Sequence, residues 1–130
     1  MEAALRPSSA VVRVLIADDE PLFLEMVEAM LTAEGMEVVG RAQDGKEAVD
    51  RTLSLVPDVT LMDISMPVLD GIEATRQIRE SAPTACVLVL TGSTAAVEID
   101  RARKAGAAAF LSKDRIASEL VATITDLAGR

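Results

Sequence analysis

The sequence predicts an α/β protein in which five strands alternate with five helices and form an open, doubly wound parallel sheet between two layers of helices. Three observations support this. Apolar, β-branched runs recur along the 130 residues, and each is followed by a segment with helical spacing of its apolar residues. The runs are apolar throughout rather than alternating, which is typical of strands covered on both faces. Five strand–helix units are too few for a closed barrel of eight.

The first strand and helix show the pattern clearly. Residues 11–17 form a nearly unbroken apolar run, and Pro21 suits the first turn of a helix. Gly35 then ends that helix, as a residue just beyond a helix C-terminus often does. Helical spacing predicts that the buried face of this helix, methionines included, is formed by Leu22, Phe23, Met26, Val27, Met30 and Leu31.

The other elements follow in strict alternation. Further strands are expected at 36–42, 58–63, 85–91 and 107–112, and further helices between Asp44 and Pro57, from Gly71 to near Pro83, at 95–105 and from Ile116 to Gly129. The strand at 36–42 is the most polar, which favours an edge position, and the strand at 85–91 is the most apolar, which favours a central one. The helix at 95–105 has few large apolar residues, so it should be the least firmly anchored.

Composition excludes several classes of function. The chain has 13 Lys and Arg against 21 Asp and Glu, a net charge of −8, so these residues are not expected to bind nucleic acid directly. Without any histidine, His-based catalysis and His metal ligands are excluded. Cys86, the single cysteine, is expected to be a buried small hydrophobic residue. No apolar run approaches the length of a membrane span and residues 1–10 lack a signal core, which together favour a cytoplasmic protein.

Chemically active side chains follow four of the predicted strands. Asp18 and Asp19 come after the first strand, Asp63 after the third, Thr91 after the fourth and Lys113 after the fifth. The carboxyl ends of parallel strands share one edge of the sheet, where ligands bind in folds of this type. We therefore expect these side chains to lie together.

The residue types indicate phosphoryl chemistry at this edge. Oxygen ligands without His or Cys select a hard cation such as Mg²⁺, with Mn²⁺ as a substitute. Asp63 could act as a nucleophile that forms an acyl phosphate, while Lys113 and Thr91 neutralise and hydrogen-bond the phosphoryl oxygens. The simpler alternative is that these aspartates are turn formers or helix caps. We keep the cap interpretation for Asp70 alone.

The chain resembles the receiver domain of bacterial two-component response regulators, which have a flavodoxin-like (CheY-like) fold with strand order 2-1-3-4-5. The matching stretches are Leu15-Ile16-Ala17-Asp18-Asp19-Glu20-Pro21, Leu61-Met62-Asp63-Ile64-Ser65-Met66-Pro67-Val68-Leu69-Asp70-Gly71, Leu88-Val89-Leu90-Thr91 and Lys104-Ala105-Gly106-Ala107-Ala108-Ala109-Phe110-Leu111-Ser112-Lys113-Asp114. The resemblance covers residues 11–128, leaving 1–10 as a flexible arm and 129–130 as a C-terminal end or the start of a linker.

The resemblance implies a role for each site residue. Asp63 would accept a phosphoryl group from a sensor histidine kinase, and Mg²⁺ would be held by Asp18, Asp19, Asp63 and the backbone carbonyl of Ser65. Thr91 and Phe110 would form the switch pair, and Lys113 would bond a phosphoryl oxygen. Phosphorylation would alter the surface of the fourth helix, fifth strand and fifth helix, and dimerisation through the first or fourth helix stays open. Such a protein is not an enzyme beyond the self-catalysed phosphorylation and dephosphorylation of its own aspartate.

Two departures from the family pattern qualify this interpretation. Many receivers carry a proline after the lysine, whereas Asp114 follows Lys113 here, so we expect a trans bond. The ending Phe110-Leu111-Ser112-Lys113-Asp114 is similar to the NarL/FixJ (LuxR-type) branch, whose members usually continue into a DNA-binding domain that this chain has no room for. We expect the receiver of a transcription regulator, with a stand-alone receiver acting through protein–protein contacts as the alternative.

Two other functions compete with a phosphoryl-activated switch. An interaction module with this fold but no phosphorylation would lack an acidic ligand, the Thr or the Lys, and this chain keeps all of them. A Mg²⁺-dependent phosphohydrolase would place a second Asp two residues after the nucleophile, where this sequence has Ser65.

Overall fold

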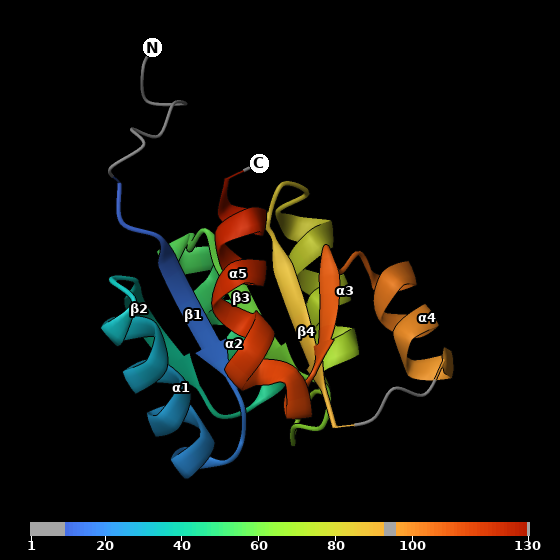
Figure 1. The fold of residues 1–130 in the computed structure, drawn as a ribbon. Helices are drawn as coiled ribbons and strands as arrows, with labels where there is room; N and C mark the ends of the chain where they lie inside the picture. The colour runs from blue at the N-terminus through green and yellow to red at the C-terminus, as the bar shows by residue number, and fades with distance from the viewer. Residues whose placement is uncertain (1–9, 93–95, 130) are drawn as a thin grey trace.

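A computed structural model describes residues 10–92 and 96–129 of the chain. Most of the predicted N-terminal arm, the first residue of the predicted helix at 95–105, and Arg130 lie outside these residues. Five parallel strands form one sheet in the order β2-β1-β3-β4-β5 (Figure 1), which confirms the predicted α/β architecture and topology. The strands are β1 Arg13–Ala17, β2 Glu37–Ala42, β3 Val59–Asp63, β4 Val87–Thr91 and β5 Ala109–Ser112.

The positions of β2 and β4 in the sheet follow from their polarity. The polar β2 forms one edge of the sheet, as predicted. The strand β4 is buried along its whole length and lies between β3 and β5, away from the edges of the sheet, as predicted for the most apolar strand, while β3 is the middle strand. Both β3 and β4 have a strand on each side and helices on each face, and burial alone does not distinguish such neighbours.

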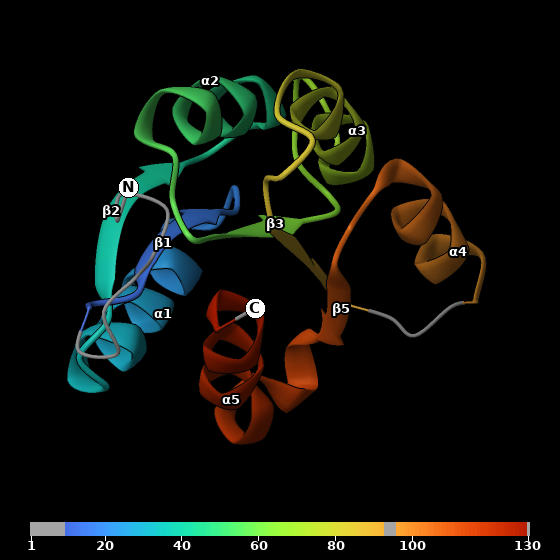
Figure 2. The ribbon, with the colours of Figure 1, turned by 90° about the horizontal axis from the view of Figure 1, so that it is seen from above.

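Helices cover both faces of the sheet (Figure 2). On one face lie α1 (Pro21–Ala33) and α5 (Ile116–Ala128), and on the other lie α2 (Gly45–Leu55), α3 (Gly71–Ser81) and α4 (Ala96–Ala105). Each layer has its own apolar core, one built against α1 and α5 and the other against α2, α3 and α4. A short 3₁₀ turn, η2 (Lys113–Arg115), joins β5 to α5. The result is the three-layer arrangement that the sequence predicted.

The helix boundaries match their sequence signals. Asp44 and Asp70 cap α2 and α3, each accepting a hydrogen bond from the backbone N–H three residues later. The cap interpretation of Asp70 is therefore confirmed. Gly35 follows α1 with a φ of +82°, a conformation that few residues other than glycine adopt readily.

The buried face of α1 differs from the predicted one. Leu24, Val27 and Leu31 are buried, whereas Leu22 is 76% exposed and Met26 is 48% exposed. Phe23 and Met30 are half-buried against the core. Helical spacing was correct, but α1 bears apolar residues on more than one side, and only packing against the sheet decides which of them are covered.

Two smaller predictions have different outcomes. Cys86 is half-buried against the core rather than fully buried, so that prediction was wrong in degree. The buried residues of α4 are only alanines, Ala102 and Ala105, and its Val97 is 71% exposed. This agrees with a helix that buries little apolar area.

Candidate functional site

The register of the sheet brings Asp18 and Asp63 side by side. Ala17 of β1 pairs with Met62 of β3, and this is the last pair of the ladder between the two strands. Asp18 directly follows Ala17, and Asp63 directly follows Met62. Both side chains are nearly buried, with 1% of Asp18 and 5% of Asp63 exposed, while Asp19 is exposed. Two acidic residues 45 positions apart thus become neighbours at the carboxyl edge of the sheet.

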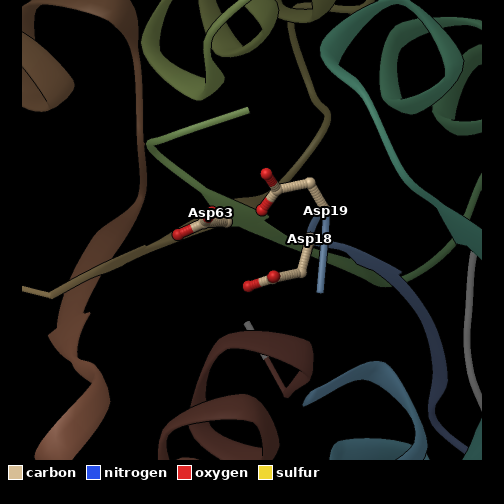
Figure 3. Close-up of side chains that lie close together, drawn as sticks. All are labelled: Asp18, Asp19 and Asp63. Carbon is tan, nitrogen blue, oxygen red and sulfur yellow. The ribbon is translucent and has the colours of Figure 1, made fainter. Parts of the chain in front are cut away.

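Three carboxyl groups converge at this edge. Carboxylate oxygens of Asp18, Asp19 and Asp63 all lie within 4.8 Å of one another, and Figure 3 shows the three side chains close together. The backbone N–H of Glu20 donates to Asp18 Oδ1 at 2.9 Å, which fixes the turn that carries the pair. The predicted clustering of Asp18, Asp19 and Asp63 is confirmed.

Lys113, in the turn that follows β5, contacts two of these carboxylates. Its Nζ lies 2.7 Å from Asp18 Oδ2 and 3.1 Å from Asp63 Oδ1. The peptide bond between Lys113 and Asp114 is trans, as predicted, since no cis bond occurs among the described residues. The lysine therefore reaches Asp63 without a proline after it.

The environment of the site shifts the pKa of Asp63 and of Lys113. Burial, followed by the nearby Asp18 carboxylate, raises the pKa of Asp63 from 3.8 to about 6, against the opposing pull of Lys113. Burial disfavours the charged form of Lys113, but its hydrogen bond to Asp18 and the charge of Asp63 outweigh that effect and raise the pKa of the lysine. The site therefore holds more negative charge than its one lysine compensates.

These residues fit a hard divalent cation. Three carboxylates within 4.8 Å supply oxygen donors, and the raised pKa of Asp63 indicates that a further positive charge there would be favourable. Mg²⁺ is commonly bound through one or two carboxylates with water completing its coordination. Asp18, Asp19 and Asp63 are the side chains that could hold it.

The remaining predicted residues lie at or near the same edge. Thr91 ends β4 and is 3% exposed, and Asp63 pairs in the ladder with Leu90, the residue before it. Ser65 is exposed in the loop that follows β3. Phe110 lies one strand farther along, half-buried, with the guanidinium of Arg103 5.4 Å from its ring centre. The fold thus places Thr91 at the same edge of the sheet as the carboxylates, and Phe110 on β5 beside Arg103 of α4.

The loop between β3 and α3 is packed against the backbone of Asp63. A Cβ added at Gly71 would lie 1.9 Å from the carbonyl oxygen of Asp63, and the Gly71 N–H donates to Ile64 O at 2.8 Å. Within the loop, Val68 has a φ of +71°, which is rare for a β-branched residue. The close approach of Gly71 and the strained Val68 indicate that tertiary contacts hold this loop in place.

The sequence interpretation missed two residues that contact the site or the loop after β3. The ring of Phe23 in α1 lies 4.3 Å from Lys113 Nζ, although its helical spacing predicted only a core residue. Gly45 begins α2, and a Cβ added there would lie 1.8 Å from the backbone oxygen of Leu69. Neither contact has a local signal, because each joins segments far apart in the sequence.

Comparison with curated proteins gives relatives that are longer than this chain. "Transcriptional regulatory protein PdtaR" of Mycobacterium tuberculosis is 44% identical over 112 residues, which cover 86% of this chain and 54% of that protein. "Protein-glutamate methylesterase/protein-glutamine glutaminase 2" of Pseudomonas fluorescens is 44% identical over 106 residues, covering 79% of this chain and 28% of that protein. The chain therefore spans about half, or less, of the length of these relatives.

Comparison with solved structures gives whole-domain matches. The response regulator domain of CheB from Thermotoga maritima has a TM-score of 0.86 at 33% identity and covers 93% of this chain and 98% of that one. The signal receiver domain of NarL from Mycobacterium tuberculosis has a TM-score of 0.85 at 35% identity and covers 92% and 97%. The model of the response regulator receiver domain family matches residues 14–125. With its five-stranded fold and its cluster of acidic residues, this chain belongs to the response regulator receiver domain family.

Proposed function

We propose that this receiver domain is switched by phosphorylation of Asp63. The observation that carries the proposal is the position of this carboxylate: it ends the middle strand of the sheet, 3.1 Å from Lys113 Nζ, with carboxylate oxygens of Asp18 and Asp19 within 4.8 Å. A nucleophilic carboxylate, a cationic partner and a set of hard oxygen donors are what phosphoryl transfer requires.

The donor in this proposal is a phosphohistidine of a sensor histidine kinase. A carboxylate oxygen of Asp63 forms the new P–O bond, the P–N bond to the donor imidazole breaks, and the leaving imidazole nitrogen takes up a proton. Lys113 neutralises the oxygens of the transferring group, and Thr91 offers them a hydroxyl donor. The reaction stays confined to the chain's own aspartate.

Mg²⁺, with Mn²⁺ as a substitute, is the proposed cofactor. Bound among the three carboxylates, the cation would supply positive charge to the oxygens of the transferring phosphoryl group. The residues proposed to hold it are Asp18, Asp19 and Asp63, together with the backbone carbonyl of Ser65. This assignment is supported by the convergence of the carboxyl groups and by the raised pKa of Asp63.

The proposed output is a change in the surface formed by α4, β5 and α5. Thr91 would turn toward the phosphoryl group, and Phe110 would move inward beside it. Support comes from α4, whose buried residues are only two alanines, so that little apolar packing opposes its displacement. A helix with two alternative positions can be shifted from one to the other by a single local change of charge, such as phosphorylation.

We further propose that the domain regulates transcription through a separate output domain. The PdtaR relative is named a transcriptional regulatory protein. The ending Phe110-Leu111-Ser112-Lys113-Asp114 and the likeness to the NarL receiver favour the NarL/FixJ branch, although the CheB receiver matches equally well. A cytoplasmic location and dimerisation upon phosphorylation complete the proposal. Sedimentation before and after phosphorylation tests the dimerisation.

None of the helices in the described part of the chain combines the length and apolarity that crossing a bilayer requires.

Intact mass spectrometry tests the central step. Incubation with acetyl phosphate and Mg²⁺ is expected to add the mass of one phosphoryl group, and Asp63→Asn is expected to abolish the gain. Asp70→Asn is the matched control, because Asp70 lies seven positions later in the same segment, caps α3, and Asn caps helices equally well. Absence of any mass gain in the wild-type protein at millimolar Mg²⁺ would refute the proposal.

A further inference from the structure

The ammonium group of Lys113 contacts two acidic side chains and one aromatic ring. Its Nζ lies 2.7 Å from Asp18 Oδ2 and 3.1 Å from Asp63 Oδ1, and 4.3 Å from the centre of the Phe23 ring. Phe23 belongs to α1 and Lys113 to η2, so 90 residues of sequence separate them. They meet because α1 and the β5–α5 connection lie on the same side of the sheet (Figure 2).

This geometry restricts a side chain that is otherwise flexible. An ammonium has three N–H donors on a four-carbon stem with many rotamers. Two directions are taken by Asp18 and Asp63, and the electron-rich face of the Phe23 ring lies on a third. The side chain of Lys113 keeps only 28% of its surface exposed.

We propose that Phe23 is a positioning residue for the phosphoryl site: its ring holds Lys113 between Asp18 and Asp63 through a cation–π contact. The inference rests on the proposed function for its consequence in phosphoryl transfer, but not for the contact itself. When the ring is removed, water hydrates the ammonium and the lysine gains rotamers directed toward solvent. Lys113 then spends less time where the transferring phosphoryl oxygens must be neutralised.

Three variants separate this role from simple packing. Phe23→Leu keeps an apolar side chain but removes the ring, and Phe23→Tyr keeps both. Leu22→Ala is the control, because Leu22 is adjacent on α1 and 76% exposed. Phe23 is half-buried, Leu22 is exposed, and both changes at Phe23 retain a large apolar side chain. Folded protein is therefore expected in each case, and circular dichroism verifies it.

Nuclear magnetic resonance reads the contact directly. Protons above an aromatic ring face resonate upfield, and the chain has two Phe, no Tyr and no Trp. The other phenylalanine, Phe110, faces Arg103. An upfield shift of the Lys113 ε-protons is therefore expected in the wild type and in Phe23→Tyr, and its loss in Phe23→Leu. Wild-type ε-protons at the position of an unrestrained lysine would overturn the proposal.

Phosphorylation kinetics read the consequence. With acetyl phosphate and saturating Mg²⁺, Phe23→Leu is expected to be phosphorylated about three- to tenfold more slowly than the wild type, the range that the energy of a partly desolvated cation–π contact implies. Phe23→Tyr and Leu22→Ala should both be phosphorylated at the wild-type rate. Equal rates for Phe23→Leu and wild type would overturn the positioning role. A wild-type protein that accepts no phosphoryl group would instead refute the proposed function, and the resonance of Lys113 would still decide whether Phe23 positions it.

Discussion

Replacing Asp63 by asparagine is expected to stabilise the metal-free domain at neutral pH. Asp63 is 5% exposed, and its pKa is raised from 3.8 to about 6 by burial, then by the Asp18 carboxylate. A carboxyl whose pKa rises on folding favours the folded state only while it is protonated. Above pH 6 the folded wild-type protein must keep this group charged in an unfavourable place, and an amide of the same shape removes that cost.

The magnitude follows from the pKa difference. The interval from 3.8 to about 6, at about 1.4 kcal/mol per pH unit, gives an expected gain of about 3 kcal/mol for Asp63→Asn at pH 7.5. The gain shrinks as pH falls through 6, because the folded wild-type protein becomes protonated there. It should be about half as large at pH 5 and nearly absent below pH 3.8, where the unfolded chain is protonated as well.

Urea denaturation in EDTA at pH 7.5 and at pH 5 measures both the sign and the pH dependence. Asp70→Asn serves as the control, since Asp70 is an exposed helix cap and Asn replaces it well. Its unfolding free energy should stay within about 0.5 kcal/mol of wild type at both pH values. Burial would not be the cause of the raised pKa of Asp63 if Asp63→Asn were no more stable than wild type at pH 7.5, or if its advantage were unchanged at pH 5.

Four further experiments test other parts of the structure. Mg²⁺ should raise the unfolding midpoint of the wild type more than that of Asp63→Asn, as a thermal melt with and without EDTA would reveal, because a ligand stabilises only the state that binds it. Gly71→Ala should cost about 1–3 kcal/mol in urea denaturation, since the new Cβ would lie 1.9 Å from the Asp63 carbonyl oxygen; no loss would contradict that contact. Asp70→Ala should lose about 1 kcal/mol, and equal stability would contradict its capping role. Leu24→Ala should lose about 2–5 kcal/mol in the same assay and Leu22→Ala less than about 0.5 kcal/mol, whereas the predicted helix face would give Leu22 the larger loss.

Much of the site was predictable because it is built from strand ends. Asp18, Asp63, Thr91 and Lys113 each follow an apolar run, and parallel strands deliver such residues to one edge whatever the details of packing. Asp70 was predictable for a different reason. A helix cap is a local hydrogen bond, made between residues three positions apart, so the sequence beside it contains the whole signal.

The face of α1 was not predictable in the same way. Leu22, Leu24 and Met26 are all apolar, and helical spacing allows more than one of them to face the core. Which one is buried depends on the angle at which α1 meets the sheet. That angle depends on packing in the apolar core that α1 shares with β1, β3 and α5, which no single segment encodes, and it buries Leu24 while leaving Leu22 at the surface.

By itself the sequence determined the order of strands and helices, the edge at which the polar groups gather and the residue types available for chemistry there. Those features depend on apolar periodicity, caps and strand ends, all of which are local. The tertiary structure decided how the groups are held. It set Lys113 between Asp18 and Asp63, laid the Phe23 ring against the lysine, and raised the pKa of Asp63 to about 6. Distances, burial and charge interactions arise only when distant segments pack together, because each depends on atoms that the folded chain alone brings into contact.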